Sequence, residues 1–416
     1  MSTSSGRGRP LVGGAVRLLC LLWLAGVAMR MTLLVVPPII PLVHEELHMS
    51  ETQIGLLMGL PLAMFAVAAV PGSLLIARIG ARLALVLGMV IAALAGGARS
   101  AAIDVWTLYA ASIVTGLGIA VMQPGMPTLA RDWLPGRIAL GTVFYSNGMM
   151  IGAILPPVLT IPFVLPLIGG SWRLNFIFWA LPAALIAIVF LLLSPKEPPH
   201  DHKTETNVKV GGGLWWPDWK NPLIWLLGLA FGSNNSPFFA ANAFLGDYLA
   251  SEGAGRFLGL ALTSLNGAQI FAFAILFLMA NRLTQRAWPF LLCGPCMLAG
   301  FLGLIFLSSP TAVIICTALI GISTALTMTP TLALPALLAA PGDVPRIAAG
   351  MFTVSYTCAI IIPTICGALW DATGEPWTAF VPLCVCSVTL AVLGAIVSRF
   401  PPQRTTATLL ASTKRL

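Results

Sequence analysis

The segment PTLARDWLPGRIALG, residues 127–141, has a second version in PTLALPALLAAPGDVPRIAAG, residues 330–350. Both segments begin with Pro-Thr-Leu-Ala, and both end with Arg-Ile-Ala followed two residues later by Gly. The two versions lie about half a chain apart. Similarity at a fixed separation is typical of a duplicated architecture. The repeat therefore predicts two halves of equivalent topology.

Long apolar runs surround both segments. The 416 residues are 58% hydrophobic and only 9% charged, whereas an average soluble domain is about 25% charged. A transmembrane helix needs about 20 apolar residues, so this composition excludes a water-soluble globular protein. We expect twelve membrane-spanning helices in an all-α fold, over residues 16–42, 54–76, 83–100, 105–129, 138–166, 172–193, 222–248, 257–280, 288–307, 311–338, 347–369 and 378–398.

The basic residues lie in alternate loops between these predicted helices. The net charge is +8, and 18 of the 22 Lys and Arg residues fall in one set of loops and in the two termini. By the positive-inside rule this set is cytoplasmic. We therefore expect a multi-pass protein of the cell inner (plasma) membrane with both termini in the cytoplasm, and no nucleic-acid partner. The predicted parts are an N-terminal six-helix half (1–194), a cytoplasmic linker (195–221), a C-terminal six-helix half (222–400) and a cytoplasmic tail (401–416).

Arg30 lies near the centre of the first predicted helix, with apolar runs on both sides. An Arg at the centre of a bilayer costs about 2.5 to 3.5 kcal/mol on insertion scales, so the side chain should face the bundle interior. No mid-helix Asp, Glu, His or Lys is available to neutralise it. A guanidinium without a counter-ion is suited to bind a small anion or a nitro group through its planar fork of donors. The alternative is a structural Arg bonded to carbonyls that Pro37 and Pro38 free.

Polar residues of the two halves fall at equivalent positions. Tyr145 and Asn147 lie in the fifth predicted helix, and the offset from Arg137 to Arg346 places Asn147 on Tyr356 of the eleventh. This equivalence predicts that they contact a solute from opposite sides. Interhelical hydrogen bonding is the alternative role for each of them.

The seventh and fourth predicted helices supply further candidate ligands. Asn234 and Asn235 precede Pro237 and Phe239, a stretch suited to a bent helix that lines a polar space. Gln123 of the fourth helix is a further donor. Interhelical hydrogen bonding is again the alternative for these amides.

Six short segments together resemble one family. They are Met29-Arg30 with Pro37 and Pro38, SETQIGLL at 50–57, RDWLP at 131–135, YSNGMMIG at 145–152, SWR at 171–173 and WDATG at 370–374. On these segments the chain is similar, over most of its length, to the cyanate and 2-nitroimidazole permease family of the major facilitator superfamily. The resemblance implies two six-helix halves that rock about a solute held near the midplane.

The loop with Arg78, Gly80 and Arg82 resembles the superfamily signature between its second and third helices. The resemblance implies a gating loop. The acidic residue that usually precedes the first Arg is Ala77 in this chain, so the ion pair of that signature is not expected.

His44-Glu45-Glu46-Leu47-His48 matches H-E-x-x-H, the zinc-binding motif of metalloproteases. It lies in a short predicted outer loop, and an acidic helix end is the competing interpretation. All eight cysteines fall in apolar runs, and the chain has no G-x-x-x-x-G-K-[ST] motif. We therefore expect no cofactor and no resident metal.

Together these features predict a secondary active or facilitative transporter of a small anionic or nitro-bearing solute, acting by alternating access as a monomer in the lipid bilayer. Because guanidinium stays protonated, Arg30 is a poor proton carrier. Protons are a candidate coupling ion, while facilitated diffusion and exchange stay equally open. The alternatives are an exporter of small toxic aromatic compounds and, more distantly, a membrane zinc protease.

Overall fold

A computed structural model describes residues 12–134, 137–195, 217–275, 288–307, 309–339, 343–397 and 399. Most of the predicted linker, residues 196–216, and the whole predicted tail, 401–416, lie outside the described residues. The predicted domain boundaries stay predictions.

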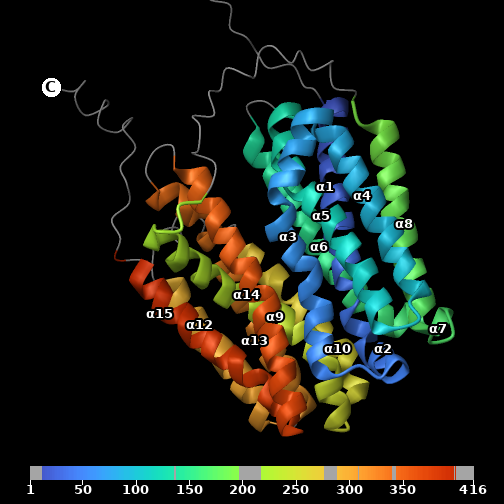
Figure 1. Ribbon diagram of the computed structural model, residues 1–416, viewed down its shortest axis with the longest axis vertical. Helices are drawn as coiled ribbons and strands as arrows, with labels where there is room; N and C mark the ends of the chain where they lie inside the picture. Colours follow the sequence, from blue (N-terminus) through green and yellow to red (C-terminus); the bar gives the residue numbers. More distant parts are fainter. Residues whose placement is uncertain are drawn as a thin grey trace, which may run out of the picture.

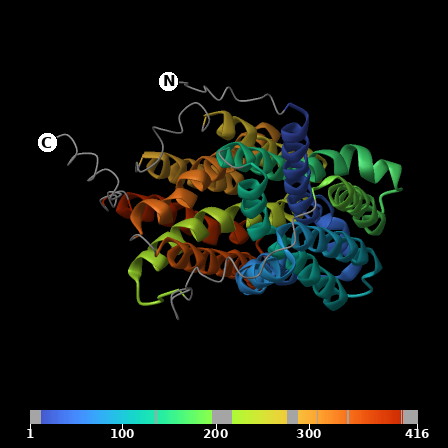
Figure 2. The same ribbon diagram turned by 90° about the horizontal axis from the view of Figure 1, so that it is seen from above.

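The regular structure of the described residues is helical throughout, which confirms the predicted all-α fold. The first group of elements is α1 (Val12–Leu34), η1 (Pro37–Ile39), α2 (Ile40–Leu47), α3 (Glu51–Ile79), α4 (Ala81–Ala98), η2 (Arg99–Ala101), α5 (Val105–Trp133), α6 (Ile138–Leu159), η3 (Thr160–Val164), α7 (Leu165–Leu167) and α8 (Trp172–Leu193). The second group is α9 (Pro222–Ser251), η4 (Gly255–Phe257), α10 (Leu258–Gly267), α12 (Trp288–Phe306), α13 (Pro310–Leu338), α14 (Val344–Thr373), η5 (Pro376–Phe380) and α15 (Val381–Val397). Figures 1 and 2 show the two groups side by side.

Eleven described helical segments are long and apolar enough to cross a membrane. The remaining predicted span, 222–248, corresponds to α9, which carries more polar residues than its neighbours, including Asn234, Asn242 and Asp247. Nearly every residue from Leu227 to Leu249 of α9 is buried by protein. A helix enclosed in this way does not need a continuous apolar surface.

Capping residues define where several helices begin. The hydroxyl of Ser50 accepts from the backbone N–H of Gln53, whose side chain in turn accepts from the backbone N–H of Ser50. Asp104 caps α5 by accepting from the side chain and backbone of Thr107, and these hydrogen bonds hold the pKa of Asp104 below its usual value. Both residues complete capping boxes, which satisfy backbone donors that a helix start leaves unpaired.

The first predicted span, 16–42, corresponds to one membrane-crossing segment, Gly14–Leu47, but this segment is not one continuous α-helix. Helix α1 ends at Leu34, and Pro37 and Pro38 begin the 3-10 helix η1 before α2 starts. Proline lacks the backbone N–H that continues an α-helix. The fifth predicted span also changes its winding, because a π-helical turn, η3, lies between α6 and α7.

The two groups contact each other from the centre of the bundle to the end that carries α2, which we call the α2 end (Figure 1, bottom). Gly55 and Gly59 of α3 face α14 there. A Cβ on Gly55 would overlap the backbone of Pro363, and one on Gly59 would lie 2.8 Å from the Cα of Ile360. Glycines therefore let the two groups approach backbone to backbone, as small residues do in membrane bundles.

Asp371 joins the groups at the same end. Its two carboxylate oxygens accept from the backbone N–H groups of Glu51 and Thr52, each at 2.9 Å, and from the Thr52 hydroxyl at 2.5 Å. A residue at the end of α14 thus caps the start of α3. Toward the other end, where Gly80 separates α3 from α4, the groups diverge (Figure 1).

Candidate functional site

The guanidinium of Arg30 reaches from α1 toward the second group of helices. Its Cζ lies 5.9 Å from the ring centroid of Phe239 on α9, and the side chain keeps part of its surface exposed. Within the described part of the chain, Arg30 forms no ion pair and no hydrogen bond. The structure therefore leaves the donors of Arg30 available to a bound group.

Arg99, rather than Arg30, is the arginine that bonds a backbone carbonyl near the end of α1. Its Nη1 donates to the Thr32 carbonyl at 3.2 Å, in the last turn of α1, and its Cζ lies 5.6 Å from the ring centroid of Phe176. Arg99 is 0% exposed, so its side chain is enclosed by protein. Carbonyls in the last turn of a helix lack intrahelical donors, which explains why a guanidinium is accommodated there.

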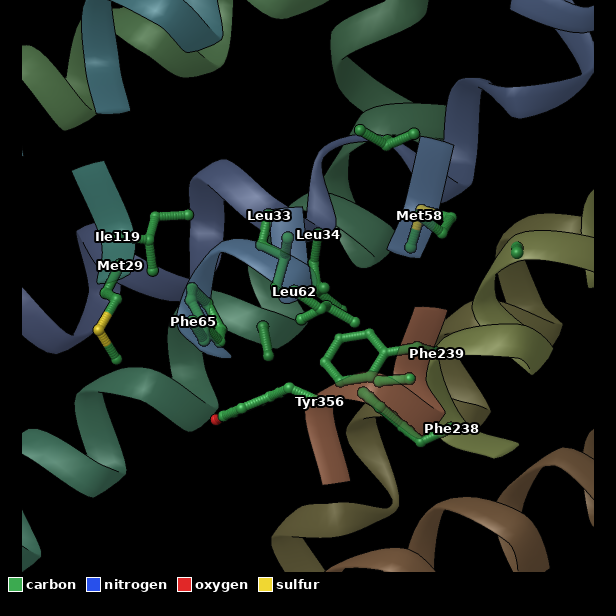
Figure 3. Packing of buried hydrophobic residues seen from close by; sticks show 14 of the residues in the cluster. Met29, Leu33, Leu34, Met58, Leu62, Phe65, Ile119, Phe238, Phe239 and Tyr356 are labelled. Carbon is green, nitrogen blue, oxygen red and sulfur yellow. The ribbon is translucent and has the colours of Figure 1, made fainter. Parts of the chain in front are cut away.

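Aromatic rings from three helices pack near Phe239. Tyr356 of α14 packs edge-on against Phe65 of α3, with ring centroids 5.0 Å apart, and stacks on Phe352 at 6.0 Å. Phe238 packs edge-on against Phe239. In Figure 3 the Tyr356 side chain extends toward Phe65, and the ring of Phe239 lies on the opposite side of Tyr356. Such rings favour a planar, conjugated ligand beside the cation.

Gln123 and Tyr356 connect the two groups of helices near these rings. The Gln123 amide donates to the Tyr356 hydroxyl at 3.1 Å. This bond joins α5 to α14, so two predicted site residues meet across the halves. A tyrosine hydroxyl that accepts one hydrogen bond still has its own proton to donate.

Asn147 and Tyr145 lie elsewhere on α6. The side-chain carbonyl of Asn147 accepts from the indole N–H of Trp23 at 2.9 Å, within the first group. Tyr145 is half-buried and packs against the hydrophobic core. The structure thus places Asn147 in interhelical bonding, and it does not show the predicted pairing of Asn147 with Tyr356 around one space.

Asn234 and Asn235 differ in their surroundings, although they are neighbours on α9. The Asn234 amide donates to the Thr324 carbonyl at 3.1 Å and its oxygen accepts from the Thr327 hydroxyl at 2.7 Å. Asn235 is buried but forms no hydrogen bond with the described residues. Asn234 is therefore committed to holding α9 against α13, whereas the Asn235 amide is free for a ligand.

We expect Asn234→Ala to lower the free energy of unfolding by about 1 to 3 kcal/mol, because a membrane hydrogen bond contributes about 0.6 to 1.7 kcal/mol and two are lost. Asn235→Ala, the matched control, should change stability much less. Thermal unfolding in detergent micelles measures both. An Asn234→Ala variant of unchanged stability that no longer binds solute would contradict this assignment.

The predicted gating loop lies at the diverging end of the bundle. Gly80 separates α3 from α4 with φ 84°, a conformation that favours glycine. The Arg82 side chain donates to the Ser194 hydroxyl and to the Leu191 carbonyl, both at 2.6 Å, while Arg78 is exposed. Arg82 therefore fastens α4 to the end of α8 within one group.

The H-E-x-x-H segment does not form a protease site. His48 ends α2 with φ 49° and is exposed, while Glu46 binds Arg173 and the Trp172 indole N–H. His44 instead lies against Asp247 of α9, with Nδ1 3.0 Å from Oδ2. The two histidines thus have different surroundings.

Fold and site together define a class of protein. The chain is a multi-pass α-helical membrane protein whose two halves meet around a partly buried cationic side chain and aromatic rings. A family model described as the Major Facilitator Superfamily matches residues 22–363. The chain therefore belongs to the major facilitator superfamily of transporters, and the zinc-protease interpretation is wrong.

Individual relatives are distant but align over nearly their full length. The cyanate transport protein CynX of Escherichia coli strain K12 is 26% identical over 92% of this chain and 98% of its own. The 2-nitroimidazole transporter of the same organism is 24% identical over 89% and 92%. A bacterial homolog of the human lysosomal transporter Spinster, solved in an inward-facing and unoccupied conformation, superposes with a TM-score of 0.72 at 17% identity, over 94% of this chain and 98% of its own. That last likeness concerns the fold alone.

Proposed function

We propose that this transporter carries a small anionic or nitro-bearing solute by alternating access, with Arg30 as the principal binding residue. The observation that carries the proposal is the Arg30 guanidinium, which faces the opposite half without a protein counter-ion among the described residues. Burying such a charge is costly unless a partner neutralises it. A negatively charged or strongly accepting solute supplies that partner.

Shape and hydrogen bonding support the same class of solute. Cyanate is a small linear anion and 2-nitroimidazole is a planar nitro compound, and proteins named for transporting them are relatives of this chain. A planar solute on the guanidinium fork would lie beside Phe239 and within reach of the Tyr356 hydroxyl. Asn235, whose amide is free in the described structure, is a further donor from α9.

Uptake into proteoliposomes tests the proposal. We expect saturable uptake of cyanate or 2-nitroimidazole, and little uptake of 2-methylimidazole, which keeps the ring but lacks the nitro group. Liposomes without protein give the background. Equal uptake of 2-methylimidazole, or no uptake of either proposed solute, would refute the proposed substrate class.

Direction and coupling are tested separately. Cells expressing the protein should accumulate the solute if it is an importer, whereas an exporter of toxic aromatic compounds would lower accumulation. Because Arg30 stays protonated, it is not the proton carrier. An imposed pH gradient that drives uptake against a concentration gradient would identify protons as the coupling ion.

A further inference from the structure

Three acid–base side chains converge at the α2 end, away from Arg30. His44 Nδ1 of α2 lies 3.0 Å from Asp247 Oδ2 of α9 and 3.9 Å from Glu51 Oε1 at the start of α3. One ligand atom from each residue lies within 4.8 Å of those of the other two. One atom from each of the three side chains could therefore contact the same ion.

Burial distinguishes this cluster from an ordinary group of surface charges. The side chains of Glu51 and Asp247 are each 9% exposed, whereas that of His44 is 31% exposed. Glu51 Oε2 is fully buried and has no hydrogen-bond partner. Asp371, the nearby acid, uses its oxygens to cap α3. The Glu51 oxygen nearer His44 is Oε1. A buried carboxylate whose second oxygen has no partner is costly, and a cation bound by that carboxylate would lower the cost.

The donor types indicate which cation fits. Two carboxylates and a neutral imidazole balance the charge of a divalent ion. Imidazole nitrogen favours Zn²⁺ and related transition metals, whereas Mg²⁺ and Ca²⁺ favour oxygen ligands alone. Around a tetrahedral Zn²⁺, neighbouring ligand atoms lie about 3.4 Å apart, since Zn–N and Zn–O bonds are about 2.0 to 2.2 Å. The observed separations need only small side-chain movements to reach that geometry.

We propose that His44, Glu51 and Asp247 form a binding site for a divalent transition-metal cation, with Zn²⁺ as its best-fitting probe. On binding, Zn²⁺ takes the place of the proton between His44 Nδ1 and Asp247. The proton leaves to water or to Nε2, so the imidazole stays neutral with one proton on Nε2, and water completes the coordination from the exposed side of the imidazole. Because His44 and Glu51 belong to one half and Asp247 to the other, the bound cation holds the α2 end closed. The effect of the closed α2 end on transport rests on the proposed function. The binding of Zn²⁺ to the three side chains does not.

Isothermal titration of the purified full chain with Zn²⁺ tests the site directly. We expect one Zn²⁺ per chain, with at least a tenfold loss of affinity in His44→Ala and in Asp247→Asn. His48→Ala, which removes the other histidine of the same segment, is the matched control and should bind as the wild type does. Mg²⁺ at the same concentration should not compete. Absence of saturable binding, or equal binding by wild type and both cluster variants, overturns the site.

Thermal unfolding distinguishes a variant that has lost the metal site from a variant that folds poorly. Zn²⁺ should raise the Tm of the wild type and of His48→Ala, because a ligand that binds only the folded chain stabilises it. The Tm of His44→Ala should not respond to Zn²⁺, and an equal response there contradicts the proposal. In proteoliposomes, Zn²⁺ should slow uptake by the wild type and not by His44→Ala. If Zn²⁺ binds but does not slow uptake, the closing role is rejected and the binding site is not. The titration and the Tm measurement do not depend on which solute is transported.

Discussion

Replacing Arg30 with glutamine will weaken solute binding by about 10- to 100-fold, because a hydrogen bond to a charged group contributes about 1.5 to 3 kcal/mol and 1.4 kcal/mol is a factor of ten. Glutamine keeps polarity and similar length but removes the positive charge. The loss should fall on the apparent affinity for the solute, measured as the concentration giving half-maximal uptake in proteoliposomes.

Two variants control for this result. Arg30→Lys keeps the charge but loses the planar fork of donors, so its affinity should lie between those of the wild type and Arg30→Gln. Arg256→Gln makes the same charge change at an exposed residue of η4 and should leave uptake unchanged. Wild-type affinity in Arg30→Gln, at equal protein incorporation, would show that Arg30 does not bind the solute.

Gly55→Ala will reduce transport by at least tenfold, because the added Cβ overlaps the backbone of Pro363 where α3 meets α14. Backbone atoms cannot move aside as a flexible side chain can, so the α2 end cannot close as observed. Alternating access requires each end to close in turn. Two measurements test this prediction: solute uptake, and the labelling of a cysteine introduced at the α2 end. Uptake should fall and labelling should increase, because the α2 end stays open.

Gly96→Ala is the matched control for this prediction. A Cβ on Gly96 of α4 meets no other atom within 4 Å, and alanine favours a helix over glycine by about 1 kcal/mol. This variant should therefore transport normally. If Gly55→Ala also transports normally, the close approach of α3 to α14 is not required for the cycle.

Composition and the internal repeat predicted the fold because the bilayer imposes length and apolarity on every spanning helix. The prediction was weakest where local chemistry interrupts a helix, as at Pro37 and Pro38 between α1 and α2. Helix α9 was predicted despite its polar residues, and its burial on nearly all sides explains how it tolerates them.

The candidate site was only partly predictable. Arg30 was proposed as a site residue from the cost of a mid-membrane charge, which requires no knowledge of neighbours, and its role stays a prediction. Phe65 and Phe352 were missed, since nothing in an apolar helix distinguishes a ring beside the site from one that faces lipid. The structure brings Gln123 to Tyr356, whereas the Asn147 amide oxygen bonds Trp23. A residue's position in the repeat therefore predicts which helix it lies on and how far along that helix it lies. It does not predict which side chain it will contact.

Long-range pairing also explains the roles of Arg99 and His44. Arg99 bonds a carbonyl 67 residues earlier in the chain, and His44 pairs with Asp247 across 203 residues. The H-E-x-x-H pattern directed attention to the pair His44 and His48, whereas the fold supplies different partners for His44. A spacing pattern along one helix cannot reveal a cluster assembled from three.

The most direct test of the central claim is an experimental structure of the protein with the solute that shows saturable uptake. We predict that the anionic or nitro group lies within hydrogen-bonding distance of the Arg30 guanidinium, between Phe239 and the Tyr356 hydroxyl. A solute bound elsewhere, with Arg30 bonded only to backbone carbonyls, would contradict the account.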